Sequence, residues 1–186
     1  MTVIGPEEAA KALLDIEQMV VRVRQSRTYD IASVTMILWG VLVGAGNIAT
    51  FVSPPHGPYI WISVNAIGAI GSIAVSVFWF PRLGGLDFDL RITAAFLLFF
   101  AFGLLCSNVF GHFGPRELGA FWPIYFMLFY CLAGLWFGHA FVIIGLGITA
   151  LTLIGYFFVT GGAFLLWMAA VNGGGLILGG LWMRRI

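Results

Sequence analysis

Phe78-Trp79-Phe80-Pro81-Arg82 closes a long apolar run, and two related phrases close two later runs. These are Leu135-Trp136-Phe137-Gly138-His139 and Leu181-Trp182-Met183-Arg184-Arg185. Each phrase places a tryptophan shortly before a basic or titratable residue. This order is typical of a helix leaving hydrocarbon, because tryptophan prefers the headgroup boundary and arginine the water beyond it. The distance between successive phrases leaves room for two membrane crossings, so the pattern predicts a helical hairpin made three times.

The composition requires lipid as solvent. Apolar residues make up 61% of the 186 residues and charged residues 9%, against roughly 45–50% and about 25% in soluble domains. From residue 31 onward, charged residues lie only between or after the apolar runs. The lipid bilayer is therefore the first expected partner. Nucleic-acid binding is excluded, because the net charge is only +1 and no basic face is present.

The predicted fold is an all-α membrane protein with six transmembrane helices. Each apolar run is close to the roughly 20 residues that a helix needs to cross a bilayer. The spans are expected at about 31–52, 58–80, 91–113, 119–138, 140–159 and 163–183. They form a transmembrane domain of residues 31–186, with three repeated hairpins at about 31–82, 91–139 and 140–185.

The arginines predict the orientation in the membrane. Three of them precede the first span, Arg82 and Arg91 bracket the second loop, and Arg184 and Arg185 end the chain. The opposite side holds only Arg116, which Glu117 matches. By the positive-inside rule, both termini are expected in the cytoplasm.

Residues 6–27 differ in kind from the spans. Pro6 suits the first turn of a helix, and Leu13, Ile16, Val20 and Val23 recur at helical spacing to form one apolar stripe. We therefore expect residues 1–30 to form a cytoplasmic amphipathic helix on the membrane surface. This helix either covers the inner face of the bundle or docks a cytoplasmic partner.

The first 50 residues also resemble the start of small uncharacterised six-helix inner-membrane proteins of proteobacteria. The likeness lies in Asp15-Ile16-Glu17-Gln18-Met19, in Arg22, Arg24 and Tyr29, and in Ile37-Leu38-Trp39-Gly40. It implies a bacterial inner-membrane setting. It assigns no activity and no site residue.

Glycines recur at close helical spacing in several spans, as Gly40-xxx-Gly44, Gly68-xx-Gly71, Gly175-xxx-Gly179 and the run Gly173–Gly175. Between helices that lipid solvates, glycine allows close backbone approach and so supplies much of the contact. These faces are expected either to pack inside one chain or to form a homo-oligomer interface.

The sequence carries no enzyme motif. It has no phosphate-binding loop, no nucleophile elbow, no His-Glu metalloprotease pattern and no Cys-xx-Cys pair. The spans also lack the carboxylates through which proton-coupled pumps usually relay protons. The protein is therefore not expected to be an enzyme or a proton-coupled transporter.

Four asparagines are the candidate ligand-binding residues. An amide in hydrocarbon is costly unless it is hydrogen-bonded, so these side chains should face the bundle interior. They either form interhelical bonds that lock the bundle or line a polar pocket open to the outside. The four are Asn47, Asn65, Asn108 and Asn172.

Two outer-loop histidines, His56 and His112, are candidate ligands for a metal or a haem, because imidazole is the commonest protein ligand for zinc, copper and haem iron. The alternative is that both are solvated loop residues. His139 stands where Arg82 and Arg185 stand in the other phrases, which predicts an interfacial anchor. The cysteines, Cys106 and Cys131, fall within spans and are expected to act as small apolar residues.

Three functional hypotheses follow from these residues. The leading one is a transporter or channel-like bundle that binds a small polar or ionic ligand in an outward-facing pocket. The second is a membrane sensor or regulatory subunit that acts on a cytoplasmic partner through residues 6–27. The third is a metal- or haem-binding membrane protein that uses His56 and His112.

Overall fold

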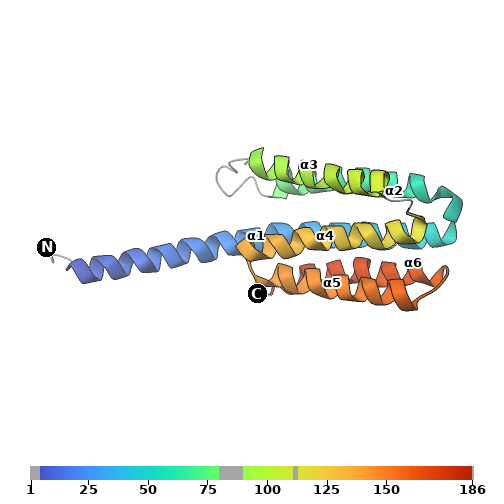
Figure 1. Ribbon diagram of the computed structural model, residues 1–186. Coiled ribbons are helices and arrows are strands. Elements are labelled where there is room, and N and C mark those ends of the chain that lie inside the picture. The colour runs from blue at the N-terminus through green and yellow to red at the C-terminus, as the bar shows by residue number, and fades with distance from the viewer. Residues whose placement is uncertain (1–4, 80–89, 111–112, 186) are drawn as a thin grey trace.

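A computed structural model of the chain describes residues 5–79, 90–110 and 113–185, and every regular element in those ranges is helical (Figure 1). This confirms the predicted all-α class. The elements are α1 (Pro6–Val52), η1 (Pro54–His56), α2 (Gly57–Ala74), η2 (Val75–Trp79), α3 (Leu90–Leu105), η4 (Cys106–Phe110), α4 (Pro115–Phe137), α5 (His139–Phe158), α6 (Ala163–Met168), η5 (Ala169–Gly174) and α7 (Gly175–Met183).

Five described helical stretches are long and apolar enough to cross a membrane. They are Tyr29–Val52, Pro54–Val77, Pro115–Phe137, His139–Phe158 and Ala163–Met183. The third of the six expected spans, 91–113, is represented by a shorter apolar helix, Ala94–Val109. Length and composition thus support a membrane protein, and five of its expected crossings reach spanning length.

The structure corrects the predicted break after the N-terminal segment. Residues 6–27 are continuous with the first span, because α1 runs without interruption for 47 residues. Its N-terminal part projects beyond the bundle, in line with the first span (Figure 1). No glycine or proline occurs between Pro6 and Gly40 to end the helix.

The helices alternate in direction, so their ends gather at two opposite ends of the bundle (Figure 1). The turns after α1 and α5 lie at one end. The C-terminus and the turn at Gly138 lie at the other, where η2, α4 and α7 also finish. The described parts of the three tryptophan phrases therefore share one end. Residues 80–82 of the first phrase lie outside the described ranges.

The closest helix packing crosses the boundaries of the expected hairpins. The most extensive helix contacts join α4 to α5 and join α1 to η5 and α7. Helices α4 and α5 meet through a tight turn at Gly138, whose φ of 130° is one that residues with a side chain rarely adopt. A side chain at Gly134 or Gly145 would collide with backbone atoms of the other helix, at 2.8 and 2.9 Å.

Glycines make the α1 contact as well. A Cβ added at Gly173 would lie 2.7 Å from the Cα of Gly44, and one added at Gly180 would lie 2.8 Å from the carbonyl oxygen of Ser33. Ser33 donates a buried hydrogen bond of 2.7 Å to the Gly180 carbonyl. The expected packing of glycines inside the monomer is confirmed at these positions.

Helix α3 joins the bundle through aromatic side chains. The rings of Phe99 and Tyr125 stack with centroids 4.1 Å apart, and the Tyr125 hydroxyl donates to the Phe99 carbonyl over 2.8 Å. Gly103 lies beneath Trp122 and Tyr125 of α4. Stacked and tilted ring pairs of this kind stabilise a fold beyond the effect of the area that they bury. At α3 they take the place of the close backbone contacts that glycines make between the other helices.

Candidate functional site

The four asparagines separate into two pairs. Asn47 and Asn172 are buried, whereas Asn65 and Asn108 are exposed. The amides of Asn47, Asn65 and Asn108 each donate to the carbonyl four residues earlier in the same helix, over 2.9, 2.7 and 2.8 Å. Each amide therefore satisfies a donor within its own helix. The structure brings only Asn47 and Asn172 into the bundle interior.

Helical register explains why Asn65 lies outside. The buried residues of α2 in the same region are Val64 and Gly68. Gly68 packs beneath the Trp39 ring, and Val64 lies against Gly46 of α1. Asn65 follows Val64 by one position, which turns its side chain about 100° away from that contact.

Asn47 lies on the face of α1 that meets the last span. Gly40, Gly44, Asn47 and Phe51 recur at spacings of three and four, so they share one helical face. Gly44 lies against the backbone of Gly173, and the Phe51 ring lies against Gly162. Asn47, between these two contacts, is therefore directed at the segment formed by α6 and η5.

Asn172 lies within a π-helical segment, η5, in the middle of the last span. Its side chain is 3% exposed, and its amide nitrogen lies 3.6 Å from the Met168 sulfur. A thioether is a weak acceptor, so this contact satisfies the amide nitrogen only weakly. Short π-helical turns within α-helices are frequent at functional sites.

Thr152 of α5 is a site residue that the sequence did not single out. Its side chain is fully buried, and among the described residues its hydroxyl oxygen is the buried side-chain polar atom that has no hydrogen-bond partner. Two contacts fix its register against the last span: Ile148 meets Gly175, and Gly155 meets Trp167. Thr152 lies between them on α5, at the level of η5.

We call Asn47, Thr152 and Asn172 the core polar cluster. They lie on α1, on α5 and on η5, and both α1 and α5 pack against η5. The cluster offers one hydroxyl and two amides and contains no group that ionises. It can bind a neutral polar molecule or an ion coordinated by oxygen, but it cannot perform acid–base chemistry.

The described residues give no support to a metal site. His56 is exposed in the turn after α1, and its Nδ1 forms a hydrogen bond of 2.8 Å with the Ser53 hydroxyl. His112 lies outside the described residues. Within the ranges that are described, no three His, Cys, Asp or Glu residues gather to hold an ion. Cys106 and Cys131 are both free thiols.

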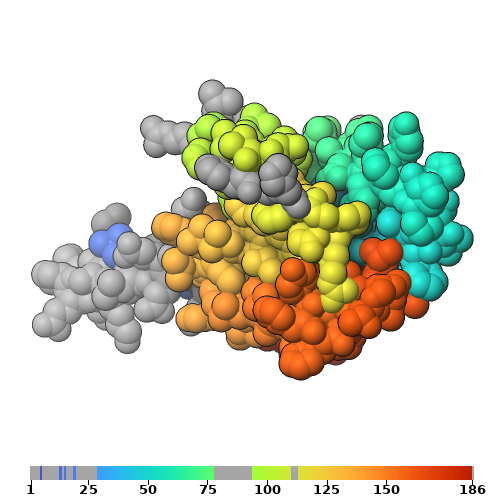
Figure 2. Space-filling view, turned by 45° about the vertical axis from the view of Figure 1, so that its right-hand side comes forward, coloured from blue at the N-terminus to red at the C-terminus, as the bar shows by residue number. Residues whose placement is uncertain are grey.

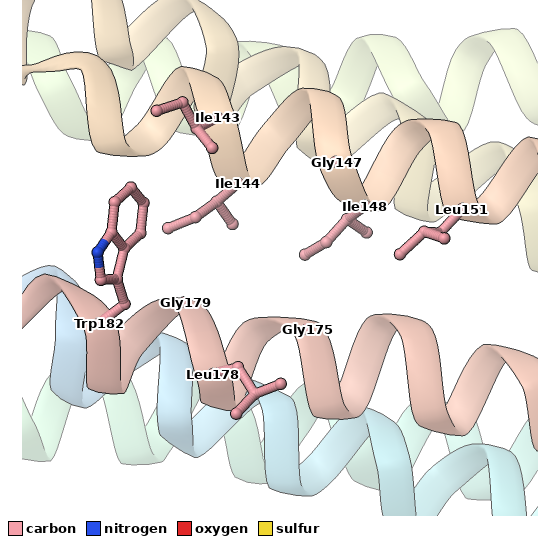
Figure 3. Close-up of a pocket in the computed structure, with 9 residues that line it drawn as sticks. All are labelled: Ile143, Ile144, Gly147, Ile148, Leu151, Gly175, Leu178, Gly179 and Trp182. Carbon is pink, nitrogen blue, oxygen red and sulfur yellow. The ribbon is translucent and has the colours of Figure 1, made fainter.

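Two open, apolar grooves are present on the described surface, and neither contains an asparagine. One, of about 390 Å³, lies between α1 and α2 beside Ala45 and Tyr59. The other, of about 310 Å³, lies between α5 and the last span beside Gly147 and Trp182 (Figure 3). They differ in kind from the core polar cluster, which lies inside the bundle.

Arg116 closes the end of the bundle nearest the core polar cluster. Its guanidinium donates from Nη2 to the carbonyls of Tyr156 and Val159, at the C-terminal end of α5. It also lies 4.6 Å from the centroid of the Phe164 ring. A cation is favourable at the negative end of a helix dipole, so Arg116 fixes the turn between α5 and α6.

Comparison of the chain with protein-family models, with curated proteins and with solved structures finds no match. The sequence resemblance of the first 50 residues contributes an expected membrane setting and no site.

Proposed function

We propose that the protein spans a bacterial inner membrane six times, with both termini in the cytoplasm, and acts as a transporter or channel-like bundle. Its ligand is a small polar molecule or ion that meets the core polar cluster. The unpaired Thr152 hydroxyl beside the π-helical segment is the single observation that carries this proposal.

The unpaired hydroxyl carries an energetic cost. A buried hydroxyl without a hydrogen bond costs about 1–3 kcal/mol in proteins, and a ligand or water that bonded to it would remove that cost. The Asn172 amide nitrogen, in η5, has the Met168 sulfur as a weak acceptor. An unpaired hydroxyl and a weakly bonded amide nitrogen at one level of the core favour an internal binding site over a purely structural lock.

The chemistry of the cluster limits the ligand. Hydroxyl and amide oxygens suit neutral polar solutes and weakly bound monovalent cations. A multivalent or strongly charged ligand would require ionised side chains, because desolvating such a charge is expensive. Proton coupling is not part of the proposal, since no carboxylate belongs to the cluster.

Transport can be tested with the full chain in proteoliposomes. Light scattering would record swelling in gradients of glycerol, urea and sodium chloride, against protein-free liposomes. We expect at least one of these solutes to enter faster with the protein present. Thr152→Val and Asn172→Leu should slow that entry, because each removes a polar group from the cluster.

The matched control is Asn65→Leu, which removes an exposed amide that bonds within its own helix. It should leave solute entry unchanged. The proposal fails if none of the three solutes enters faster than in protein-free liposomes. It also fails if Asn65→Leu slows entry as much as Asn172→Leu does.

The projecting part of α1 favours a second candidate function, that of a regulatory subunit. Leu13 and Met19 are 67% and 63% exposed on this segment. The helix that carries them continues into the contact between Gly44 and Gly173 beside the core polar cluster. A partner that bound the projecting segment would act on the same helix that forms the cluster.

Site-directed spin labelling tests this second function. In a chain whose two native cysteines are changed to serine, a label at Leu13→Cys should collide with a water-soluble nickel relaxant. Preferential collision with oxygen would instead place residue 13 in lipid, as expected for a surface helix, and would remove the regulatory proposal.

A further inference from the structure

The groove between α5 and the last span has a shape that suits a single hydrocarbon chain. It is lined by glycines, aliphatic side chains and one tryptophan, contributed by α5 and α7 (Figure 3). A Cβ added at Gly147 would meet no atom within 4 Å, so the groove is open at that residue. The lining residues are Ile143, Ile144, Gly147, Ile148, Leu151, Gly175, Leu178, Gly179 and Trp182.

The groove opens on the side of the helices that faces outward from the bundle. Ile143 and Leu178, on its two walls, are 57% and 68% exposed. Both walls belong to stretches of membrane-spanning length. From residue 143 to residue 151 the groove runs for about 12 Å along α5, most of the roughly 15 Å that one leaflet contributes to the hydrocarbon core.

One end of the groove is positively charged. Trp182 closes it at the end of the bundle where the chain terminates (Figures 1 and 3). Leu178 and Trp182 are four residues apart on one side of α7, and Arg185 follows in the turn after α7, where its backbone N–H donates to the Trp182 carbonyl over 2.9 Å. Arg185 is exposed, whereas the Nε of the neighbouring Arg184 donates to the Ser33 hydroxyl over 2.9 Å.

The start of α5 reinforces this charge. His139, the first residue of α5, precedes Ile143 by one turn and is exposed at the same end of the bundle. The first amides of a helix point outward without intrahelical partners and favour an anion. A phosphate at this end would therefore meet Arg185 and the N-terminus of α5 together, next to the indole N–H of Trp182.

We propose that this groove binds one acyl chain of an anionic phospholipid, with the phosphate placed at the charged end beside Arg185 and Trp182. The apolar groove accounts for the chain and the charged end accounts for the sign of the headgroup. This lipid site is independent of the core polar cluster. It holds whether or not the protein transports a solute.

Native mass spectrometry of the full chain in detergent tests the proposal. Dioleoyl phosphatidylglycerol and dioleoyl phosphatidylcholine would be added separately at equal concentrations. We expect the anionic lipid to remain bound at one copy per chain and the zwitterionic lipid to dissociate. Equal retention of the two lipids would overturn the charged-end assignment.

Three variants locate the site. Gly147→Phe fills the groove from its open side and should abolish retention of phosphatidylglycerol. Ala150→Phe adds the same ring to an exposed position of α5 that does not line the groove, so retention should persist. Arg185→Gln should weaken phosphatidylglycerol binding about fivefold, the factor expected for one basic residue near an anionic surface.

The Arg185 variant keeps the test decisive if Gly147→Phe misfolds, because an exposed arginine at the chain end can change without disturbing the bundle. The proposal is overturned if neither Gly147→Phe nor Arg185→Gln reduces retention. It is also overturned if the wild-type chain is a dimer that Gly147→Phe converts to a monomer, since a second copy of the chain would then occupy the groove.

Discussion

Replacing Thr152 by valine separates a true binding site from an accidental unpaired hydroxyl. The side chain is fully buried on α5, and its Oγ1 has no partner in the described structure. Valine exchanges the hydroxyl for a methyl group of nearly the same size. The substitution therefore leaves the packing of α5 almost unchanged and removes one polar atom.

The two interpretations predict opposite signs. If the hydroxyl is truly unpaired, valine removes a penalty of about 1–3 kcal/mol and stabilises the fold. If a water molecule or a ligand bonds to the hydroxyl, valine loses a hydrogen bond that contributes about 0.5–1.5 kcal/mol. Our proposal requires the second result, a destabilisation of about 0.5–1.5 kcal/mol.

Thr149 provides the matched control. It lies on the same helix, and its hydroxyl donates to the Gly145 carbonyl over 2.7 Å. Thr149→Val reports the ordinary effect of this exchange on α5. The assay is the free energy of unfolding in mixed micelles, followed by tryptophan fluorescence as the fraction of denaturing detergent rises. A Thr152→Val protein more stable than the wild type by about 1 kcal/mol or more would show that nothing binds the Thr152 hydroxyl.

The same unfolding assay checks four further predictions. Gly173→Ala should destabilise the fold by about 1–3 kcal/mol, because the added Cβ meets the Gly44 backbone at 2.7 Å. Gly147→Ala should stabilise the fold by up to about 1 kcal/mol, because a Cβ added at Gly147 meets no neighbouring atom. Arg116→Gln should destabilise by about 1–3 kcal/mol, since two carbonyls at the end of α5 lose a charged donor. Gly138→Ala should cost about 1–3 kcal/mol through its positive φ; no loss of stability would show that this turn relaxes.

Sequence reasoning succeeded where apolar length and turn residues decide the outcome. The expected spans 140–159 and 163–183 correspond to α5 and to α6–η5–α7, within one residue at each end. Glycines bound these helices at Gly138 and at Gly161–Gly162, where the chain reverses. Such signals are local, so they can be read without knowledge of tertiary contacts.

The same reasoning failed at the start of the chain. The change from a charged, amphipathic pattern to an apolar one near residue 30 predicted two helices. Composition, however, indicates whether a helix lies in water or in lipid, and it does not indicate where the helix ends. With no glycine or proline between Pro6 and Gly40, the backbone has no cause to break, and α1 passes through that change in composition as one helix.

The inward-facing residues were also beyond prediction. A transmembrane helix is apolar on every side, so periodicity does not show which face meets its neighbours. Asn65 and Asn47 look equivalent in sequence, and each shares a face with a glycine that touches another helix, yet only Asn47 is buried. Thr152 carried a signal of this kind as well, because it lies on the same face as Gly145 and Gly155. Those glycines indicate the inward face of α5 only once their contacts with neighbouring helices are known.

The packing and the polar chemistry of the bundle converge on one short segment. Lipid leaves the helices little hydrophobic reason to associate, so glycine contacts must hold α1 against the last span, and Gly173 makes the closest of these. The residue before it is Asn172, one of the two buried amides of the core polar cluster. The segment that brings the backbones together therefore also carries the polar group. An exchange of Asn172 for leucine would keep the glycine contact and remove the chemistry, whereas an exchange of Gly173 for alanine would disturb both. If the η5 segment served packing alone, only the exchange of Gly173 for alanine would impair the protein.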